Sequence, residues 1–316
     1  MTNILLIVLG LAGAAASAPV LPSGSDRLIR SKQLFEAGNF SEVIAGLSPE
    51  AMQKLRKDDL RQAYFLLGVS YERSQQGDKA LGVYQLGAKL FPKDINLLSQ
   101  LAYLLHRSGL EEHAAPVYRK VLDIHRNNAA AHLGLGQIDH SLGYLERSTQ
   151  HYEKALEEWK GNAGVWRDYA DVLLEMKDYK TAELAVNKAL DLSRNNPESL
   201  VQLAFVQRGS GRLSEALKTL EAAIQHHPRR KDISLLRALW LLEADRFQEA
   251  GTSAQEALNA DPNNALARWI RARVHLQAGR GREARRDLEA AAAGKPQALF
   301  VSRLSAAMAS WLKERP

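Results

Sequence analysis

Apolar residues recur along this chain at the three- and four-residue spacing of one face of an α-helix, and turn residues interrupt them. One apolar group is Leu97, Leu98, Leu101, Leu104 and Leu105. Glycines stand at the interruptions, where a left-handed helix end costs them nothing, and prolines stop helices at a second shared position. These residues are Gly109, Gly143, Gly211 and Gly279, with Pro92, Pro228, Pro262 and Pro296. The pattern predicts a succession of helix, turn, helix, turn.

Small residues return at one fixed period in three columns, which hold their register from residue 61 to about 298 without an insertion. The first column is Gly68, Ala102, Gly136, Ala170, Ala204, Ala238 and Ala272. The second is Ala80, Ala114, Ser148, Ala182, Ala216, Ala250 and Ala284, and the third is Gly87, Val121, Ala155, Ala189, Ala223, Ala257 and Ala291. A period of about 34 residues indicates stacked repeats, each of which is a pair of helices joined by tight turns.

One unit contains Tyr64, Leu67, Gly68, Tyr71, Ala80, Tyr84, Gly87 and Pro92. These residues resemble the aromatic, Leu-Gly, Tyr, Ala, aromatic and Pro signature of the tetratricopeptide repeat. The resemblance covers seven units of equal length over 61–298, starting at 61, 95, 129, 163, 197, 231 and 265. It extends more weakly to a degenerate first repeat over 25–60, whose second helix is broken at Ser48-Pro49. The resemblance implies an all-α fold, a right-handed superhelical solenoid of helix-turn-helix repeats in which each unit packs against its neighbours.

The two ends of the chain differ from the repeats. Residues 1–18 have an apolar run followed by small residues, which is the order of a signal peptide, although an uncleaved membrane anchor is the competing interpretation. Residues 19–24 are then a short linker. Residues 299–316 are amphipathic, with Leu299, Leu304, Met308, Trp311 and Leu312 on one side, and suit a C-terminal capping helix. We therefore expect an exported protein, periplasmic or envelope-associated, and the absence of cysteine excludes disulfides and thiolate metal sites.

No group of residues in the sequence forms a recognisable catalytic site, so we expect neither an enzyme nor a cofactor. Gly209-Ser210-Gly211 and Gly279-Arg280-Gly281 lie at turns between helices, with no preceding strand to form a phosphate loop or a nucleophile elbow. No two histidines have the four-residue spacing that would place two metal ligands on one helix face. His106 and His140 stand at equivalent places in consecutive units, and ordinary histidines are the favoured interpretation there.

The family resemblance implies that the first helix of each unit lines a concave groove, which holds a peptide or a partner's helix. Carried over by position, the groove is polar in the middle, at Arg167, Asp171 and Glu175, and apolar in its C-terminal third. The candidate partner-binding residues are Phe65, Val69, Tyr103, Val201, Phe205, Leu235, Leu239 and Trp269. Internal packing of the apolar third is an equally weighted alternative to a partner site.

Charge supplies a rival hypothesis, because the formal net charge of +6 is concentrated near the C-terminus. The candidate basic patch is Arg268, Arg273, Arg280, Arg282, Arg285 and Arg286. Such a patch could bind an anionic polymer or a membrane surface. Nucleic acid is a poor candidate, since aromatic residues among these arginines are limited to Trp269. Arg237 and Arg271 stand where the repeat signature has leucine, so we expect their stems to cover the core and their heads to pair locally.

Together these features predict a non-catalytic scaffold of the cell envelope that binds a protein or peptide partner in its groove. A pilus, secretion or polysaccharide-export machine is the kind of assembly that such a scaffold could serve, by family analogy alone. Membrane association through the N-terminus is compatible with this prediction. The sequence does not specify the oligomeric state.

Overall fold

A computed structural model describes residues 24–293, which form seventeen helices, and the chain divides after Arg126 into two compact units. In the first unit the helices are α1 (Gly24–Glu36), α2 (Phe40–Gly46), α3 (Pro49–Met52), α4 (Lys57–Arg73), α5 (Gly77–Leu90), α6 (Ile95–Arg107) and α7 (Glu111–Ile124). The second unit begins with α8 (Ala129–Ser141), α9 (Leu145–Glu158), α10 (Ala163–Glu175), α11 (Tyr179–Leu192) and α12 (Pro197–Gly209). It continues with α13 (Leu213–His226), α14 (Lys231–Glu243), α15 (Phe247–Ala260), α16 (Ala265–Gln277) and α17 (Gly281–Ala293).

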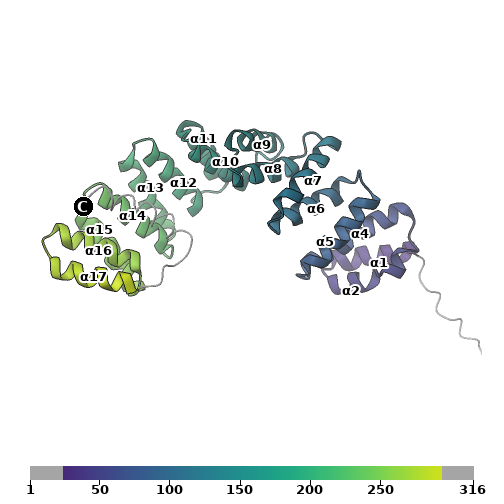
Figure 1. Cartoon of the computed structure of the whole chain (residues 1–316), viewed down its shortest axis with the longest axis horizontal. Helices are drawn as coiled ribbons and strands as arrows, with labels where there is room; N and C mark the ends of the chain where they lie inside the picture. Colours follow the sequence, from purple (N-terminus) through teal and green to yellow (C-terminus); the bar gives the residue numbers. More distant parts are fainter. Residues whose placement is uncertain (1–23, 294–316) are drawn as a thin grey trace, which may run out of the picture. The chain divides into compact units, whose positions relative to one another are not determined.

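From α4 onward the helices pack in sequential pairs, α4 with α5 up to α16 with α17, as Figure 1 shows for each unit. The prediction of an all-helical repeat fold is thereby confirmed over the described residues. The expected unit boundary at residue 61 lies inside α4, which begins at Lys57 because extended backbone at Arg56 precedes it. In the first repeat, α2 ends at Gly46, and the Ser48 hydroxyl caps the short α3 by accepting from the Ala51 N–H.

The turn inside each pair has the same backbone geometry in every repeat from α4 onward. Gly109, Gly143, Gly211 and Gly279 have positive φ, as their positions in the sequence suggested, and so do Gln75, Lys177 and Asp245 at the remaining equivalent positions. The next N–H donates to the carbonyl five residues earlier, for example Tyr144 to Asp139 at 2.7 Å. This bond satisfies a carbonyl that a helix end leaves free. Three of the seven turns therefore carry a side chain where glycine would be less strained.

Helix starts repeat with the same period. The first helix of most pairs is preceded by an Asp or Asn whose side chain accepts a backbone N–H of the first turn, namely Asp94, Asn128, Asn162, Asn196 and Asn264. These acceptors satisfy donors that a helix start leaves without a partner. Arg230 holds the equivalent place before α14 and provides no side-chain cap. Helix starts and turns are thus encoded locally in almost every repeat.

The small columns lie where helices approach closely. Ala102, Ala114 and their column-mates are buried, and the glycines of the first column differ in what faces them. A Cβ on Gly68 would come within 2.3 Å of the Tyr84 ring, whereas a Cβ on Gly136 would meet only atoms at 3.4 Å. Tyr84 is fully buried, and its hydroxyl donates to Glu72 at 2.6 Å. The ring of Tyr84 therefore fills the space that the missing side chain at Gly68 leaves.

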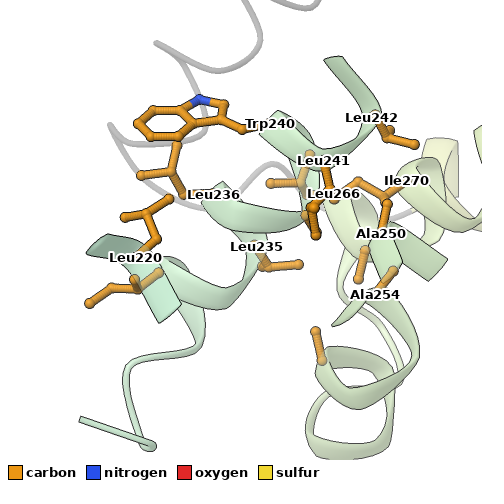
Figure 2. Packing of buried hydrophobic residues seen from close by; sticks show 14 of the residues in the cluster. Leu220, Leu235, Leu236, Trp240, Leu241, Leu242, Ala250, Ala254, Leu266 and Ile270 are labelled. Carbon is orange, nitrogen blue, oxygen red and sulfur yellow. The ribbon is translucent and has the colours of Figure 1, made fainter. Parts of the chain in front are cut away.

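The core continues from repeat to repeat instead of forming one centre. In the second unit, one buried cluster joins α12, α13, α14, α15 and α16, and Figure 2 shows Leu241, Leu266 and Ile270 meeting within it. Each helix pair buries its apolar face against the next pair, as stacked repeats require. This arrangement leaves the outward surface of successive first helices available for other contacts.

Several expectations lie outside the described residues: the signal peptide or anchor at 1–18, most of the linker at 19–24 and the capping helix at 299–316. Among residues 24–293, no helix has both the length and the apolar character that crossing a membrane requires.

Candidate protein-binding face

The candidate site is the surface of the first helices of the second unit, α8, α10, α12, α14 and α16, which we call the first-helix face. Contacts join α8 to α10, α10 to α12 and α14 to α16 directly. Side chains also link α12 to α14, where the Phe205 and Trp240 rings meet edge to face with centroids 5.1 Å apart. The face is therefore continuous across five repeats, and its chemistry changes along it.

The aromatic contact between α12 and α14 is the centre of the apolar part. Phe205 is 37% exposed, whereas Trp240 is only 4% exposed. The Arg208 guanidinium lies 5.3 Å from the centroid of the Trp240 ring and also pairs with Glu243 at 2.8 Å. The ring and the carboxylate together hold this cation, and Phe205 packs against the same buried indole ring.

The other predicted apolar residues of the second unit are less accessible. Leu235 is buried in the core, and Val201, Leu239 and Trp269 are half-buried and pack against it. The sequence left open whether the apolar strip is a partner site or internal packing. In the structure Leu235 belongs to the core, whereas Phe205 lies at the surface. Sequence reasoning missed Trp240, although it stands one repeat and one residue after Phe205, which places two aromatics in adjacent first helices.

The middle of the first-helix face carries the carboxylates of Asp168, Asp171 and Glu175, next to the half-buried Arg167. Asp168 on α10 accepts from the Gln137 amide of α8 at 3.0 Å, and Asp171 accepts from the Gln202 amide of α12 at 2.7 Å. Burial raises the pKa of both carboxyls above the ordinary value, and the amide bonds offset only part of this effect. Glu175, one turn further along α10, lies 3.1 Å from the His140 ring. These two carboxylates, with Asp168 half-buried and Asp171 exposed, are held by neutral donors, which makes this part of the face favourable for a cation.

The predicted groove residues of the first unit are placed differently. Phe65 and Val69 are half-buried on α4, and Phe65 lines a small pocket with Lys32, Arg61 and Asp94. Arg61 and Asp94 pair at 2.8 Å in that pocket. Tyr103 on α6 is 48% exposed. Phe65, Val69 and Tyr103 belong to the first compact unit, and the apolar part described above belongs to the second.

The predicted basic residues divide between two helices and the turn that joins them. Arg280, Arg282, Arg285 and Arg286 are exposed on α17 and the turn before it. Arg268 and Arg273 lie half-buried on α16, and Arg268 donates to the Pro262 carbonyl at 2.9 Å. Arg271 pairs with the buried Asp287, and Arg237 pairs with Glu221 at 2.9 Å, so the expected local pairing of these two arginines is confirmed.

Histidines form one polar cluster that the sequence did not suggest. The Nδ1 atoms of His132 and His151 lie 3.0 Å apart between α8 and α9, beside the buried Asp139, which pairs with Arg147 at 2.9 Å. The pair follows no helical spacing, since the two histidines are 19 residues apart. Over residues 24–293, no three His, Cys, Asp or Glu side chains are placed to hold a metal ion. His106 contacts the Tyr118 ring, and His140 contacts Glu175.

Comparison with known families supports the assignment of the repeats. Two sequence models described as tetratricopeptide repeat match the chain, one at residues 145–198 and 173–239 and the other at 241–299. Together they cover most of the second unit and overlap the repeats found from the period of the small columns.

The chain resembles parts of three longer curated proteins. Tetratricopeptide repeat protein 8 of Caenorhabditis elegans is 20% identical over 215 residues, which cover 55% of this chain and 42% of that protein. BBSome complex member BBS4 of Bos taurus is 23% identical, with 73% and 44% covered. Cellulose synthase operon protein C of Pseudomonas fluorescens is 31% identical over 199 residues, with 62% and 13% covered. The chain spans less than half the length of these relatives.

Solved structures share the fold. The C-terminal part of a repeat-containing protein of Cytophaga hutchinsonii has a TM-score of 0.63 at 17% identity, covering 76% of this chain and 97% of that one. PilW, a type IV pilus biogenesis factor, has a TM-score of 0.57 at 17% identity, with 64% and 93% covered. YrrB, which has an unusual peptide-binding site, has a TM-score of 0.51 at 22% identity, with 58% and 95% covered. Taken with this shared fold, the period, the helix pairs and the two family matches show that the chain is a tetratricopeptide repeat protein.

Proposed function

We propose that this protein is a non-catalytic scaffold of the cell envelope that binds a partner helix or peptide on its first-helix face. The observation that carries the proposal is the contact between Phe205 and Trp240, with Arg208 and Glu243 beside it. An aromatic ring that is 37% exposed and packed on a buried indole is the kind of anchor that dominates many protein interfaces.

The chemistry of the face restricts the partner. Apolar side chains of a helix would pack on Phe205, and cationic side chains would pair with Asp168 and Asp171. A partner with an apolar face and a basic end therefore fits better than an acidic one. Peptide binding by YrrB is a precedent on the same fold, not an assignment.

The envelope setting rests on the N-terminal sequence and on relatives. Residues 1–18 have the order of a signal peptide. PilW is named for pilus biogenesis and the Pseudomonas fluorescens relative for a cellulose synthase operon. These two names support our proposal that the protein acts in the assembly of a pilus or a polysaccharide-export machine. Separating membrane, periplasmic and cytoplasmic fractions of cells that express the full chain tests it, and a cytoplasmic protein of unprocessed mass would contradict it.

Partner binding is tested by capture from envelope extract with the full chain as bait. Phe205→Glu places a charge at the centre of the face, and Leu184→Glu is the matched control, because Leu184 is 63% exposed on α11, a second helix. We expect a protein captured by wild type and by the Leu184 variant and lost from the Phe205 variant. Equal capture by all three would refute the assignment of this face.

The rival hypothesis, binding of an anionic polymer or membrane surface, is supported by the exposed Arg280, Arg282, Arg285 and Arg286. Binding that releases counterions weakens steeply with added salt, whereas apolar contacts persist. Co-sedimentation with anionic vesicles or polysaccharide at two salt concentrations distinguishes the two functions. The anionic-surface hypothesis would be favoured if added salt abolishes binding and if the double variant Arg285→Glu, Arg286→Glu no longer binds.

A further inference from the structure

The first-helix face presents two kinds of chemistry in a fixed order. From α16 through α14 to α12 it is apolar, with Trp269, Leu239 and Phe205, and on α10 it becomes acidic, with Asp168 and Asp171. The amide donors of Gln137 and Gln202 carry no charge, and Arg167 and His140 are the cationic or titratable groups that act on these two carboxylates. An occupant matched to the whole face would therefore be apolar along most of its length and cationic at one end.

The chain itself contains such a segment beyond the described residues. Residues 298–315 read ALFVSRLSAAMASWLKER. Leu304, Met308, Trp311 and Leu312 are spaced for one face of a helix. Arg303 precedes them, and at the end Lys313 and Arg315 flank Glu314. Apart from Arg303, the cations follow the apolar positions, which is the order that a segment starting near α16 needs in order to match the face.

Length is consistent with this placement. As a helix, these 18 residues would span about 27 Å. Three steps between neighbouring packed helices, from α16 to α10, amount to about 24–30 Å. The connection from Ala293, where α17 ends, is Gly294, Lys295, Pro296 and Gln297. Four residues reach about 13 Å when extended, enough to cross one helix.

We propose that residues 298–315 bind as a helix across the first-helix face, with the apolar side on Trp269, Leu239 and Phe205 and the basic end beside Asp168 and Asp171. The segment then occupies the surface on which the proposed function places the partner, so this part of the inference rests on that function. A partner must displace the segment, and the segment acts as a built-in competitor that limits binding to partners of matching chemistry.

The absence of cysteine allows a direct test in the full chain, because introduced thiols are the only ones. We would join Met308→Cys to Phe205→Cys with a bismaleimide about 10 Å long, under dilute conditions, and measure intramolecular product by intact mass. Two matched pairs replace Phe205→Cys by Leu184→Cys on α11 or by Leu288→Cys on α17, and both of these residues are exposed. We expect at least a fivefold higher yield with Phe205 than with either alternative.

Charge variants test the basic end. Lys313→Glu with Arg315→Glu should lower the Phe205 yield at least threefold, and adding Asp168→Lys with Asp171→Lys should restore it. Equal yields for all pairs, or no response to charge, would overturn the proposal. Preferential joining to Leu288 would overturn it in favour of an end cap, and covalent dimers would overturn it in favour of a second copy.

The inference and the proposed function fail separately. Crosslinking needs no partner, so it decides the placement of the segment alone. If the segment competes, the Lys313→Glu, Arg315→Glu variant should capture at least threefold more partner than wild type. Capture by neither protein would refute the proposed function whatever the crosslinking shows, and equal capture by both would refute the competition.

Discussion

Replacing Gly68 and Gly136 by alanine should change stability in opposite directions, although both glycines belong to one column of the repeat. Alanine in a helix interior is favoured over glycine by about 0.5–1 kcal/mol. At Gly136 the new methyl would meet its neighbours at 3.4 Å, an ordinary contact, so Gly136→Ala should stabilise by about that amount.

At Gly68 the methyl would lie 2.3, 2.6 and 2.8 Å from three atoms of the Tyr84 ring. The ring is fully buried and held by its 2.6 Å bond to Glu72, so it cannot move without losing packing or that bond. Overpacking of this kind costs about 1–3 kcal/mol. After the propensity gain is subtracted, Gly68→Ala should destabilise the first unit by about 0.5–2 kcal/mol.

The assay is urea unfolding of the full chain followed by two probes. All five tryptophans, Trp159, Trp166, Trp240, Trp269 and Trp311, come after Arg126 in the sequence, so their fluorescence reports Gly136→Ala. Circular dichroism measures the helix content of both units, so destabilisation of the first unit by Gly68→Ala should appear as a loss of helix at lower urea concentration. In a Tyr84→Leu background the alanine at residue 68 should lose its cost. A wild-type or higher midpoint for Gly68→Ala, or the same cost in both backgrounds, would refute the reasoning.

Three further predictions concern the turns, a buried ion pair and the acidic face. Residues 143 and 177 both have positive φ, which glycine adopts without strain. Gly143→Ala should therefore lower the free energy of unfolding by about 1–2 kcal/mol, and Lys177→Gly should raise it by up to about 1 kcal/mol. Urea midpoints, followed by fluorescence, that move in the opposite directions would contradict this reasoning. Asp287→Ala should cost about 2–3 kcal/mol, since it strands Arg271 beside the core, and an unchanged thermal midpoint would show the pair to be dispensable. Burial raises the pKa of Asp168 above its ordinary value of 3.8. The stability that the protonated carboxyl contributes is therefore complete below pH 3.8 and is lost as pH rises through the pKa of the folded state. Asp168→Asn should raise the urea midpoint at pH 7 and not at pH 3.5, and equal effects at both pH values would refute the burial of this carboxyl.

The repeat architecture could be predicted from sequence because its determinants are local and periodic. Gly143 and Asn128 each act on the backbone within a few residues, and their equivalents return in nearly every repeat. The small columns were readable for the same reason. The steric difference between Gly68 and Gly136 could not be predicted from sequence, because it depends on how the ring of Tyr84 lies against a helix backbone.

The candidate site could be predicted only in part. Position in the repeat identified Phe205 as a surface residue, but the same reasoning placed Leu235 in the groove, and the structure buries it in the core. Trp240 was missed because a shift of one residue from the repeat position changes which way a side chain faces. The desolvation of Asp168 was also unreadable, since it arises from packing between α8, α10 and α12.

The most direct test of the central claim is site-specific photo-crosslinking in cells that produce the full chain. A photoreactive residue at position 205 samples the first-helix face, and one at position 184 samples a more exposed site on a second helix. The account predicts an adduct with a second protein from position 205 that is absent from position 184. The same adduct from both positions, or an adduct from position 184 alone, would contradict it.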